Sequence, residues 1–373
     1  MRRYFRDKLE ASPHAEPAKR RYCGIMAKKS AEMPQNPTIE IVEEFKPFLL
    51  HLQASVGEYP QYIADEDLAW SYTGLAWYYK GQGLYAIAEP YYQDCLTATR
   101  THLGDNHPHV ATSLNNLAAL YYSQGRYTEA EPLYLEALDL YKRLLGDNHP
   151  DVALSLNNLA ELYHSQGRYT EAEPLYLEAL DLRKQLLGDN HPDVASSLNN
   201  LAALYDSQGR YTEAEPLYLE ALDLRKQLLG DNHPDVATSL NNLAGLYDSQ
   251  GRYTEAEPLY LEALDLDKRL LGDNHPSVAT SLNNLALLYK SQGRYTEAEP
   301  LYREALDLKK RLLGDNHPDV AASLNNLAAL YHSQGRYTEA EPLYLEALDL
   351  HKRLLGDNHP SVATSLNNLA HLY

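Results

Sequence analysis

Histidine is the residue of this chain that most suggests chemistry, because seven of its 15 histidines recur in one Asp-Asn-His-Pro segment every 42 residues. Such side chains can bind a metal ion or transfer protons. Zinc ligands converge on one ion at about 2.0–2.1 Å, whereas residues one repeat apart are separated by two helix layers, roughly 16–20 Å. The spacing therefore excludes a shared ion and favours a role at a helix entry, beside the proline that follows each histidine. These histidines are His107, His149, His191, His233, His275, His317 and His359.

Other signs of an enzyme are missing from the sequence. It contains no nucleophile elbow, no glycine-rich phosphate loop and no zinc-protease helix. Catalysis needs one converged set of groups, and a loop that is repeated seven times does not supply one. We therefore predict that the protein is not an enzyme, with no catalytic residues, no metal site and no cofactor.

A pair of asparagines recurs in the first apolar segment of each repeat. Asparagine is a mediocre helix former, so two of them in mid-helix need a compensating gain. One interpretation is a ladder of amides along a groove, where they hydrogen-bond the backbone of an extended peptide; the other is that at least one of each pair joins adjacent repeats. We expect one amide of each pair to be exposed in the groove and the other to be structural. The pairs are Asn115/Asn116, Asn157/Asn158, Asn199/Asn200, Asn241/Asn242, Asn283/Asn284, Asn325/Asn326 and Asn367/Asn368.

Two positions near these asparagines vary although the repeats are otherwise near copies. The first carries Trp77, Ala119, Glu161, Ala203, Gly245, Leu287, Ala329 and His371; the second, three residues later, carries Lys80, Tyr122, His164, Asp206, Asp248, Lys290 and His332. A ligand with a basic residue near the two aspartates and an acidic residue near Lys290 would complement this pattern, and drift at a tolerant surface is the alternative. We predict that a peptide-binding groove is lined by the paired asparagines from Asn115 to Asn326 and by the second row from Tyr122 to His332.

The elements that must position these residues are two helices in each repeat. Apolar residues at spacings of three and four predict a helix over 108–123, which ends before Gly125. A second helix is predicted to end at Gly146. Thr128 and Glu131 have the spacing of a capping box, which predicts that this second helix begins there. The acidic residues of the second helix, Glu131 included, are expected to form a solvated outer face.

A fixed period of 42 residues is typical of a solenoid, in which each unit buries its apolar face only against its neighbours. Several residues also stand at the relative spacings of the tetratricopeptide signature. They are Leu117, Ala118, Tyr121, Ala130, Tyr134 and Ala137, within the segments Leu114-Asn115-Asn116-Leu117-Ala118 and Glu129-Ala130-Glu131-Pro132-Leu133-Tyr134. From about residue 66 to 373 the chain resembles the 42-residue repeats of kinesin light chains and nephrocystin-like bacterial proteins.

This resemblance implies an all-α, right-handed superhelical solenoid of antiparallel helical hairpins, whose first helices line a concave groove that binds peptides. Kinesin light chains carry a long heptad coiled coil before their repeats. Residues 1–60 are short, interrupted by proline and without heptads, so the sequence argues against a motor role.

The chain divides into five stretches by composition and repeat register. The leader has nine basic and four acidic residues over 1–34 and several prolines, which predicts disorder. A helix bent at Pro47 is expected to cover the first repeat. The predicted stretches are a disordered basic leader (1–38), an N-terminal capping helix region (39–65), a diverged first repeat (66–107), six repeats (108–359) and the first helix of an incomplete repeat (360–373).

Composition limits the partners. The net charge of −19 argues against nucleic acid and anionic membranes, and we find neither a signal peptide nor a membrane span, which predicts a soluble, cytoplasmic protein. With only Cys23 and Cys95, a disulfide framework is not expected. The leading hypothesis is a non-catalytic scaffold that binds a peptide segment of another protein in its groove. The alternatives are end-to-end self-association through the uncovered C-terminal helix, or the sensor arm of a larger signalling protein.

Overall fold

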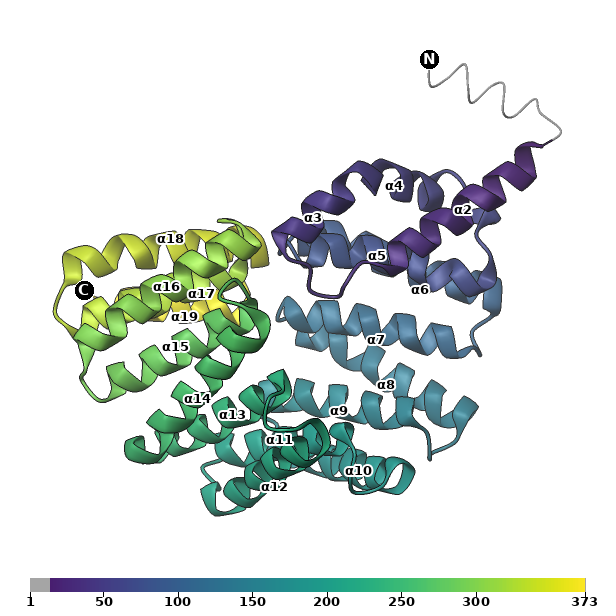
Figure 1. The fold of residues 1–373 in the computed structure, drawn as a ribbon. Coiled ribbons are helices and arrows are strands. Elements are labelled where there is room, and N and C mark those ends of the chain that lie inside the picture. Colours follow the sequence, from purple (N-terminus) through teal and green to yellow (C-terminus); the bar gives the residue numbers. More distant parts are fainter. Residues whose placement is uncertain (1–13, 373) are drawn as a thin grey trace. The chain divides into compact units, whose positions relative to one another are not determined.

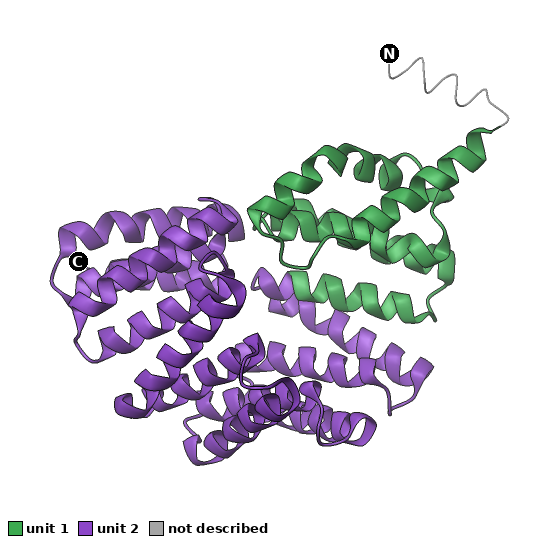
Figure 2. Cartoon of the chain, viewed as in Figure 1, with its two compact units in different colours: residues 1–120 green, residues 121–373 purple. Residues whose placement is uncertain are grey.

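The computed structural model describes residues 14–372, which form helices and the loops between them (Figure 1). Over this range no strand occurs, and the predicted all-α solenoid of helical hairpins is confirmed. The chain comprises two compact units, residues 1–120 and residues 121–373 (Figure 2).

The first unit corrects one prediction. Residues predicted to be part of a disordered leader form helix α2 (Ala15–Ala31), and residues 1–13 lie outside the described part of the chain. The basic composition was misleading because Cys23, Met26 and Ala27 are buried, and the first two belong to an apolar core that also includes residues of α5, on which α2 packs. The other helices of the unit are α3 (Ile39–Phe45), α4 (Leu49–Gly57), α5 (Leu68–Lys80), α6 (Tyr85–Leu103) and most of α7 (Pro108–Ser123).

Helix α5 belongs to the diverged repeat, and its packing explains why this repeat lacks the asparagine pair. Thr73 and Gly74 stand where the later repeats have asparagines. A Cβ atom on Gly74 would collide with the backbone carbonyl of Ser30 on α2. Only glycine allows the two helices to approach this closely. Helix α4 also packs against α5, after a short 3₁₀ turn at Lys46–Phe48 where Pro47 bends the chain.

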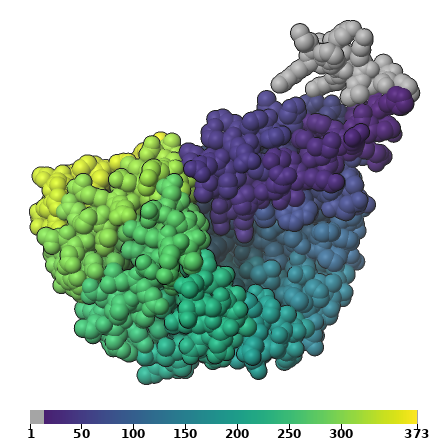
Figure 3. Space-filling view, viewed as in Figure 1, coloured from purple at the N-terminus to yellow at the C-terminus, as the bar shows by residue number. Residues whose placement is uncertain are grey.

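The second unit is a row of helical hairpins that follow the predicted 42-residue period. Its helices are α8 (Tyr127–Leu145), α9 (Pro150–Ser165), α10 (Tyr169–Leu187), α11 (Pro192–Ser207), α12 (Tyr211–Leu229), α13 (Pro234–Ser249), α14 (Tyr253–Leu271), α15 (Pro276–Ser291), α16 (Tyr295–Leu313), α17 (Pro318–Ser333), α18 (Tyr337–Leu355) and α19 (Pro360–Ala370). From α10 onward, each second helix packs on both its own first helix and the first helix of the next repeat, and α8 packs on α9. On the face seen in Figure 3, the hairpins of this unit lie against one another without a gap.

Local residues set the ends of each helix. The His149 side chain caps α9, where its Nδ1 accepts a hydrogen bond of 3.2 Å from the backbone N–H of Asp151, directly after Pro150 at the first helical position. The predicted helix-entry role of the repeated histidine is thus confirmed. Gly146, with φ of 82°, ends α8 in a conformation that favours glycine.

The predicted capping box is wrong. Helix α8 begins at Tyr127 rather than Thr128, and the residue before it, Arg126, makes no side-chain capping bond. Because Gly125, with φ of 67°, turns the chain directly into the helix, Thr128 already lies inside the first turn. The nearby arginine and glutamate of this turn serve another purpose.

In the second unit, these residues join consecutive repeats. The Arg168 guanidinium stacks on the Tyr163 ring at 4.0 Å and donates hydrogen bonds to Glu171 of its own repeat at 2.6 Å and to Glu131 of the preceding repeat at 2.7 Å. The Tyr163 hydroxyl donates to Glu131 as well, at 3.1 Å. We call this arrangement the turn clamp; it recurs around Arg210, Arg252, Arg294 and Arg336.

The turn clamp also changes the interpretation of the acidic second helices. Glu131 is a partner of the next repeat rather than part of a solvated face, and hydrogen bonding from Arg168 lowers its pKa. Sequence analysis missed this because the arginine lies 37 residues further along the chain.

We expect Arg168→Lys to weaken the contact between α8 and the next repeat. Lysine cannot stack flat on tyrosine or bind two carboxylates with a planar fork. The thermal midpoint should fall by about 2–4 °C, measured by circular dichroism. Arg311→Lys, at an exposed arginine of α16 without a hydrogen bond or ion pair to any described residue, is the control and should leave the midpoint unchanged. Equal shifts in the two variants would show that the turn clamp adds no stability.

Candidate functional site

The first helices of neighbouring repeats touch one another, α11 with α13 and α13 with α15, and so form a layer of their own. The second variable row of the sequence lies on this layer. Six of its seven residues, Tyr122, His164, Asp206, Asp248, Lys290 and His332, are all half-buried, and we call them the inner row.

We call the contact between two consecutive repeats a seam. Three members of the inner row are bonded across a seam to the next repeat. The Tyr122 hydroxyl lies 2.7 Å from Ser165 Oγ and donates to Glu161 at 3.2 Å. His164 Nε2 lies 2.8 Å from Ser207 Oγ. His332 Nε2 lies 3.4 Å from the backbone carbonyl oxygen of a residue that is likewise one repeat further on. These contacts show which positions face each other wherever two repeats meet.

The three central members have no such contact. The side chains of Asp206, Asp248 and Lys290 form no hydrogen bond or ion pair with any described residue. At the position of Glu161 they face Gly245, Leu287 and Ala329, which offer no polar side-chain atom, and the facing serines form no hydrogen bond to these charges. These serines are Ser249, Ser291 and Ser333. Burial raises the pKa of both aspartates and lowers the pKa of Lys290. The centre of the inner row therefore holds three half-buried charges that lack a partner within this structure.

The paired asparagines form a ladder between repeats. Asn200 Nδ2 donates to Asn157 Oδ1 at 2.7 Å, and Asn326 Nδ2 donates to Asn283 Oδ1 at 2.8 Å. A weaker contact of 3.4 Å joins the amides of Asn242 and Asn199.

In three pairs the first asparagine is the more enclosed one. Asn115, Asn199 and Asn325 are buried, and the amide of Asn325 also donates to Ser365 Oγ at 2.8 Å. Asn158 and Asn284, second members of their pairs, are half-buried and carry no side-chain hydrogen bond to any described residue. Joining repeats is thus one use of these amides, and peptide binding stays a prediction.

A third variable position, on the second helices, was not recognised in the sequence. It carries Tyr141, Arg183, Arg225, Asp267, Lys309 and His351. Arg225 is 7% exposed and donates to Ser239 Oγ at 2.8 Å, and Asp267 accepts from Ser281 Oγ at 2.7 Å. In successive repeats, different ionisable side chains of the second helix thus hydrogen-bond to the same repeated serine of the next first helix. Variation between constant neighbours was the signal that could have revealed it.

The structure offers no metal site among residues 14–372, where no group of three or more His, Cys, Asp or Glu side chains is placed to hold an ion. None of the described helices is long and apolar enough to cross a bilayer.

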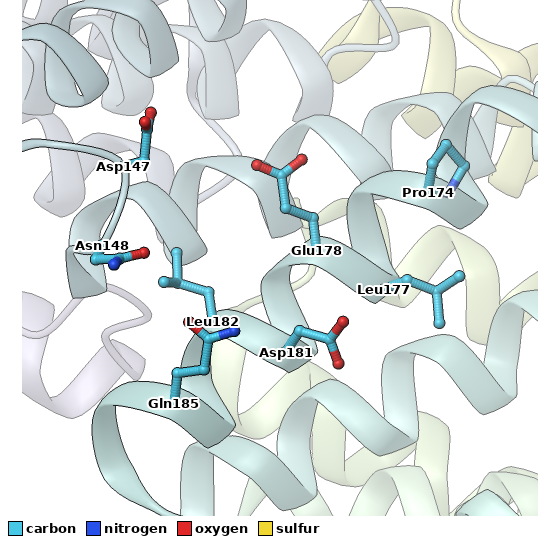
Figure 4. A pocket seen from close by; sticks show the side chains of 8 residues that line it. All are labelled: Asp147, Asn148, Pro174, Leu177, Glu178, Asp181, Leu182 and Gln185. Carbon is cyan, nitrogen blue, oxygen red and sulfur yellow. The ribbon is translucent and has the colours of Figure 1, made fainter.

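An open pocket lies on the outer side, between α10 and the loop before α9 (Figure 4). Its walls are Asp147, Asn148, Pro174, Leu177, Glu178, Asp181, Leu182 and Gln185. The same residue types return 42 residues later, from Asp189 to Gln227, and Glu178 is already paired with Lys142 at 2.9 Å. We interpret the pocket as a shallow depression that recurs on the outer surface of the repeats rather than as a unique binding site.

Comparison with known proteins agrees with the repeat geometry. A family model described as the tetratricopeptide repeat matches residues 109–185, 151–227, 193–269, 235–311, 277–350 and 319–373, and a further model of this repeat matches residues 68–109. The chain therefore belongs to the tetratricopeptide repeat family, as predicted. No curated protein gives a match.

Similar solved structures include BtubC (BKLC) from P. vanneervenii, which is 30% identical, with 66% of this chain and 94% of that chain covered and a TM-score of 0.48. The apo form of the quorum sensor NprR from B. thuringiensis is 17% identical, with 93% and 91% covered and a TM-score of 0.59. A Rap protein complexed with Competence and Sporulation Factor is 16% identical, with 89% and 96% covered and a TM-score of 0.55. The last two similarities concern the fold.

A double-mutant cycle tests the amide ladder. We expect Asn157→Ala and Asn200→Ala each to lower the free energy of unfolding by about 1 kcal/mol, and the double variant to lose less than the sum because both remove one bond. Asn158→Ala, at an amide without this bond, should cost nothing, since alanine is the better helix former. Urea denaturation measures all four variants, and strictly additive losses would contradict the ladder.

Asp206→Asn should stabilise the fold. The ionised carboxylate is half-buried, unpaired and close to the C-terminal end of α11, where the helix dipole disfavours an anion. We expect a gain of about 0.5–1 kcal/mol in the free energy of unfolding at neutral pH.

The pH dependence of this gain has a definite sign. Because the pKa of Asp206 is raised in the folded state, the carboxylate destabilises the fold above that pKa, and the penalty disappears as pH falls through it. The advantage of the variant should therefore shrink toward about pH 4. Asp223→Asn, on the exposed outer face, changes the net charge equally and should show no gain. A gain that persists unchanged at low pH would contradict the argument.

Proposed function

We propose that this protein is a non-catalytic interaction scaffold that binds an extended peptide segment of a partner protein along the first helices of its repeats. The observation that carries the proposal is the unpaired charge at the centre of the inner row. Asp206, Asp248 and Lys290 follow one another on α11, α13 and α15, half-buried and without partners among the described residues. Charged groups in such a place gain most from complementary charges on a ligand.

An extended peptide fits this layout for a geometric reason. The first helices of consecutive repeats are direct neighbours, which corrects the separation of two helix layers expected from the sequence. Neighbouring helices pack with their axes about 8–10 Å apart, so equivalent positions recur along the layer at about that interval. An extended chain advances about 3.3 Å per residue, and every third residue would meet the next repeat. Asn158 and Asn284, whose amides are not used between repeats, could bond to the peptide backbone in between.

Membership of the tetratricopeptide repeat family supports a scaffold, since elongated repeat surfaces serve as binding surfaces. The Rap structure of similar fold contains Competence and Sporulation Factor, but at 16% identity this resemblance supports only the fold. The net charge of −19 favours a protein partner over nucleic acid.

The test uses short random-sequence peptides selected for binding to the full chain. Removing two amides together, Asn158→Ala with Asn284→Ala, should weaken the selected peptides roughly tenfold, since each lost hydrogen bond is worth about 0.5–1.5 kcal/mol. Isothermal titration calorimetry gives the affinities, and circular dichroism verifies unchanged helicity.

The matched control removes two outer-face amides, Gln185→Ala with Gln227→Ala, and should leave the affinity unchanged. Equal affinities for the inner and outer variants would remove the amides from the mechanism. Failure to select any peptide would overturn the proposed function itself.

A further inference from the structure

The seam between α11 and α13 differs from its neighbours because one side chain is missing. Tyr122 shows where a residue of the inner row points, since its hydroxyl contacts Glu161 and Ser165 of the following repeat. In the seam two repeats later the corresponding residues are Asp206 and, facing it, Gly245. Glycine at this position puts no side chain where Tyr122 meets Glu161, and Ser249, the equivalent of Ser165, is the remaining facing residue.

A buried tyrosine lies next to this glycine. A Cβ atom on Gly245 would lie 3.5 Å from the Tyr260 hydroxyl oxygen, which places that hydroxyl directly beneath the glycine. Tyr260 is only 4% exposed, and its hydroxyl has no hydrogen bond to any described residue. The equivalent hydroxyl of Tyr176 donates to Glu161 at 2.7 Å. Glycine cannot supply the acceptor that Glu161 offers to Tyr176, so the Tyr260 hydroxyl is left available to a ligand.

Two carboxylates lie near the same glycine. Asp248 lies three residues after Gly245, on the same face of α13, and Asp206 lies on the adjacent helix α11. Burial raises the pKa of Tyr260, and the charges of Asp248 and Asp206 raise it further. Neither aspartate has an ion-pair partner among residues 14–372. Two anions and a phenol oxygen thus lie near Gly245, which has no side chain of its own to pair with them.

We propose that Asp206, Asp248 and Tyr260 form a subsite, opened by Gly245, for one lysine or arginine side chain of the bound peptide. The inference rests on the proposed function and names the chemistry that the groove selects. A lysine ammonium offers three donors and an arginine guanidinium five, enough to serve both carboxylates and the phenol oxygen together. Acidic and apolar side chains would leave the two carboxylates unpaired and are disfavoured.

The test compares peptides selected from one random library by the wild type and by variants of the full chain. The wild type should enrich lysine or arginine at one fixed position. In Asp206→Asn with Asp248→Asn this enrichment should vanish, and the wild-type peptides should bind on the order of ten- to a hundredfold more weakly. Gly245→Leu introduces the residue that stands at the equivalent Leu287, so it preserves the fold and should have the same effect.

A charge reversal and a matched control sharpen the result. Asp248→Lys introduces the residue found at the equivalent Lys290 and should shift the selection toward acidic residues. Asp181→Asn with Asp223→Asn removes two exposed outer charges and should bind the wild-type peptides with unchanged affinity.

The outcomes separate this inference from the proposed function. Peptides that bind well but show no basic enrichment, or that bind the double aspartate variant equally, would overturn the subsite and leave the scaffold intact. If the wild type selects no peptide, both fail.

Discussion

The seam between consecutive hairpins is the contact on which the second unit depends. A single hairpin cannot bury its apolar face alone, so each second helix must pack on the first helix of the next repeat. Small residues such as Ala172 and Ala179 are fully buried and allow close approach, while the larger Tyr176 fills the remaining space. Polar contacts then fix the register, with the turn clamp at one end of each seam and the amide ladder on the first helices.

This division of labour explains why the repeats are nearly identical yet differ at a few positions. The residues of the turn clamp cannot vary without leaving a carboxylate or guanidinium unpaired. The inner row is under no such constraint, since its side chains reach toward the next repeat from a half-exposed position. The repeated residues thus stabilise the fold, and the variable residues of the inner row can set the preference for a ligand.

Much of the fold could be predicted from the sequence because its causes are local. Proline and glycine mark the helix ends, as Pro150 and Gly146 do, and apolar spacing gives the helices between them. The predictions were wrong where contacts between residues far apart in the sequence determine the structure. Helix α2 is ordered by α5, some 40 residues away, and Glu131 is claimed by Arg168 of the next repeat. Likewise, the sequence placed Gly245 at a variable position, but only the structure shows the buried hydroxyl beneath it.

The aspartates of the inner row show how stability and binding oppose each other here. Their equivalents Tyr122 and His164 are hydrogen-bonded to the next repeat, so an uncharged residue at the same position would give a more stable fold. Asp206 and Asp248 instead retain charge near helix C-terminal ends, partly desolvated and without a counter-ion, which is unfavourable on three separate grounds. A cation delivered by a partner would relieve the last of these and turn a local weakness of the scaffold into binding energy. The same reasoning predicts that the charges that destabilise such an array most mark the place where its ligand binds.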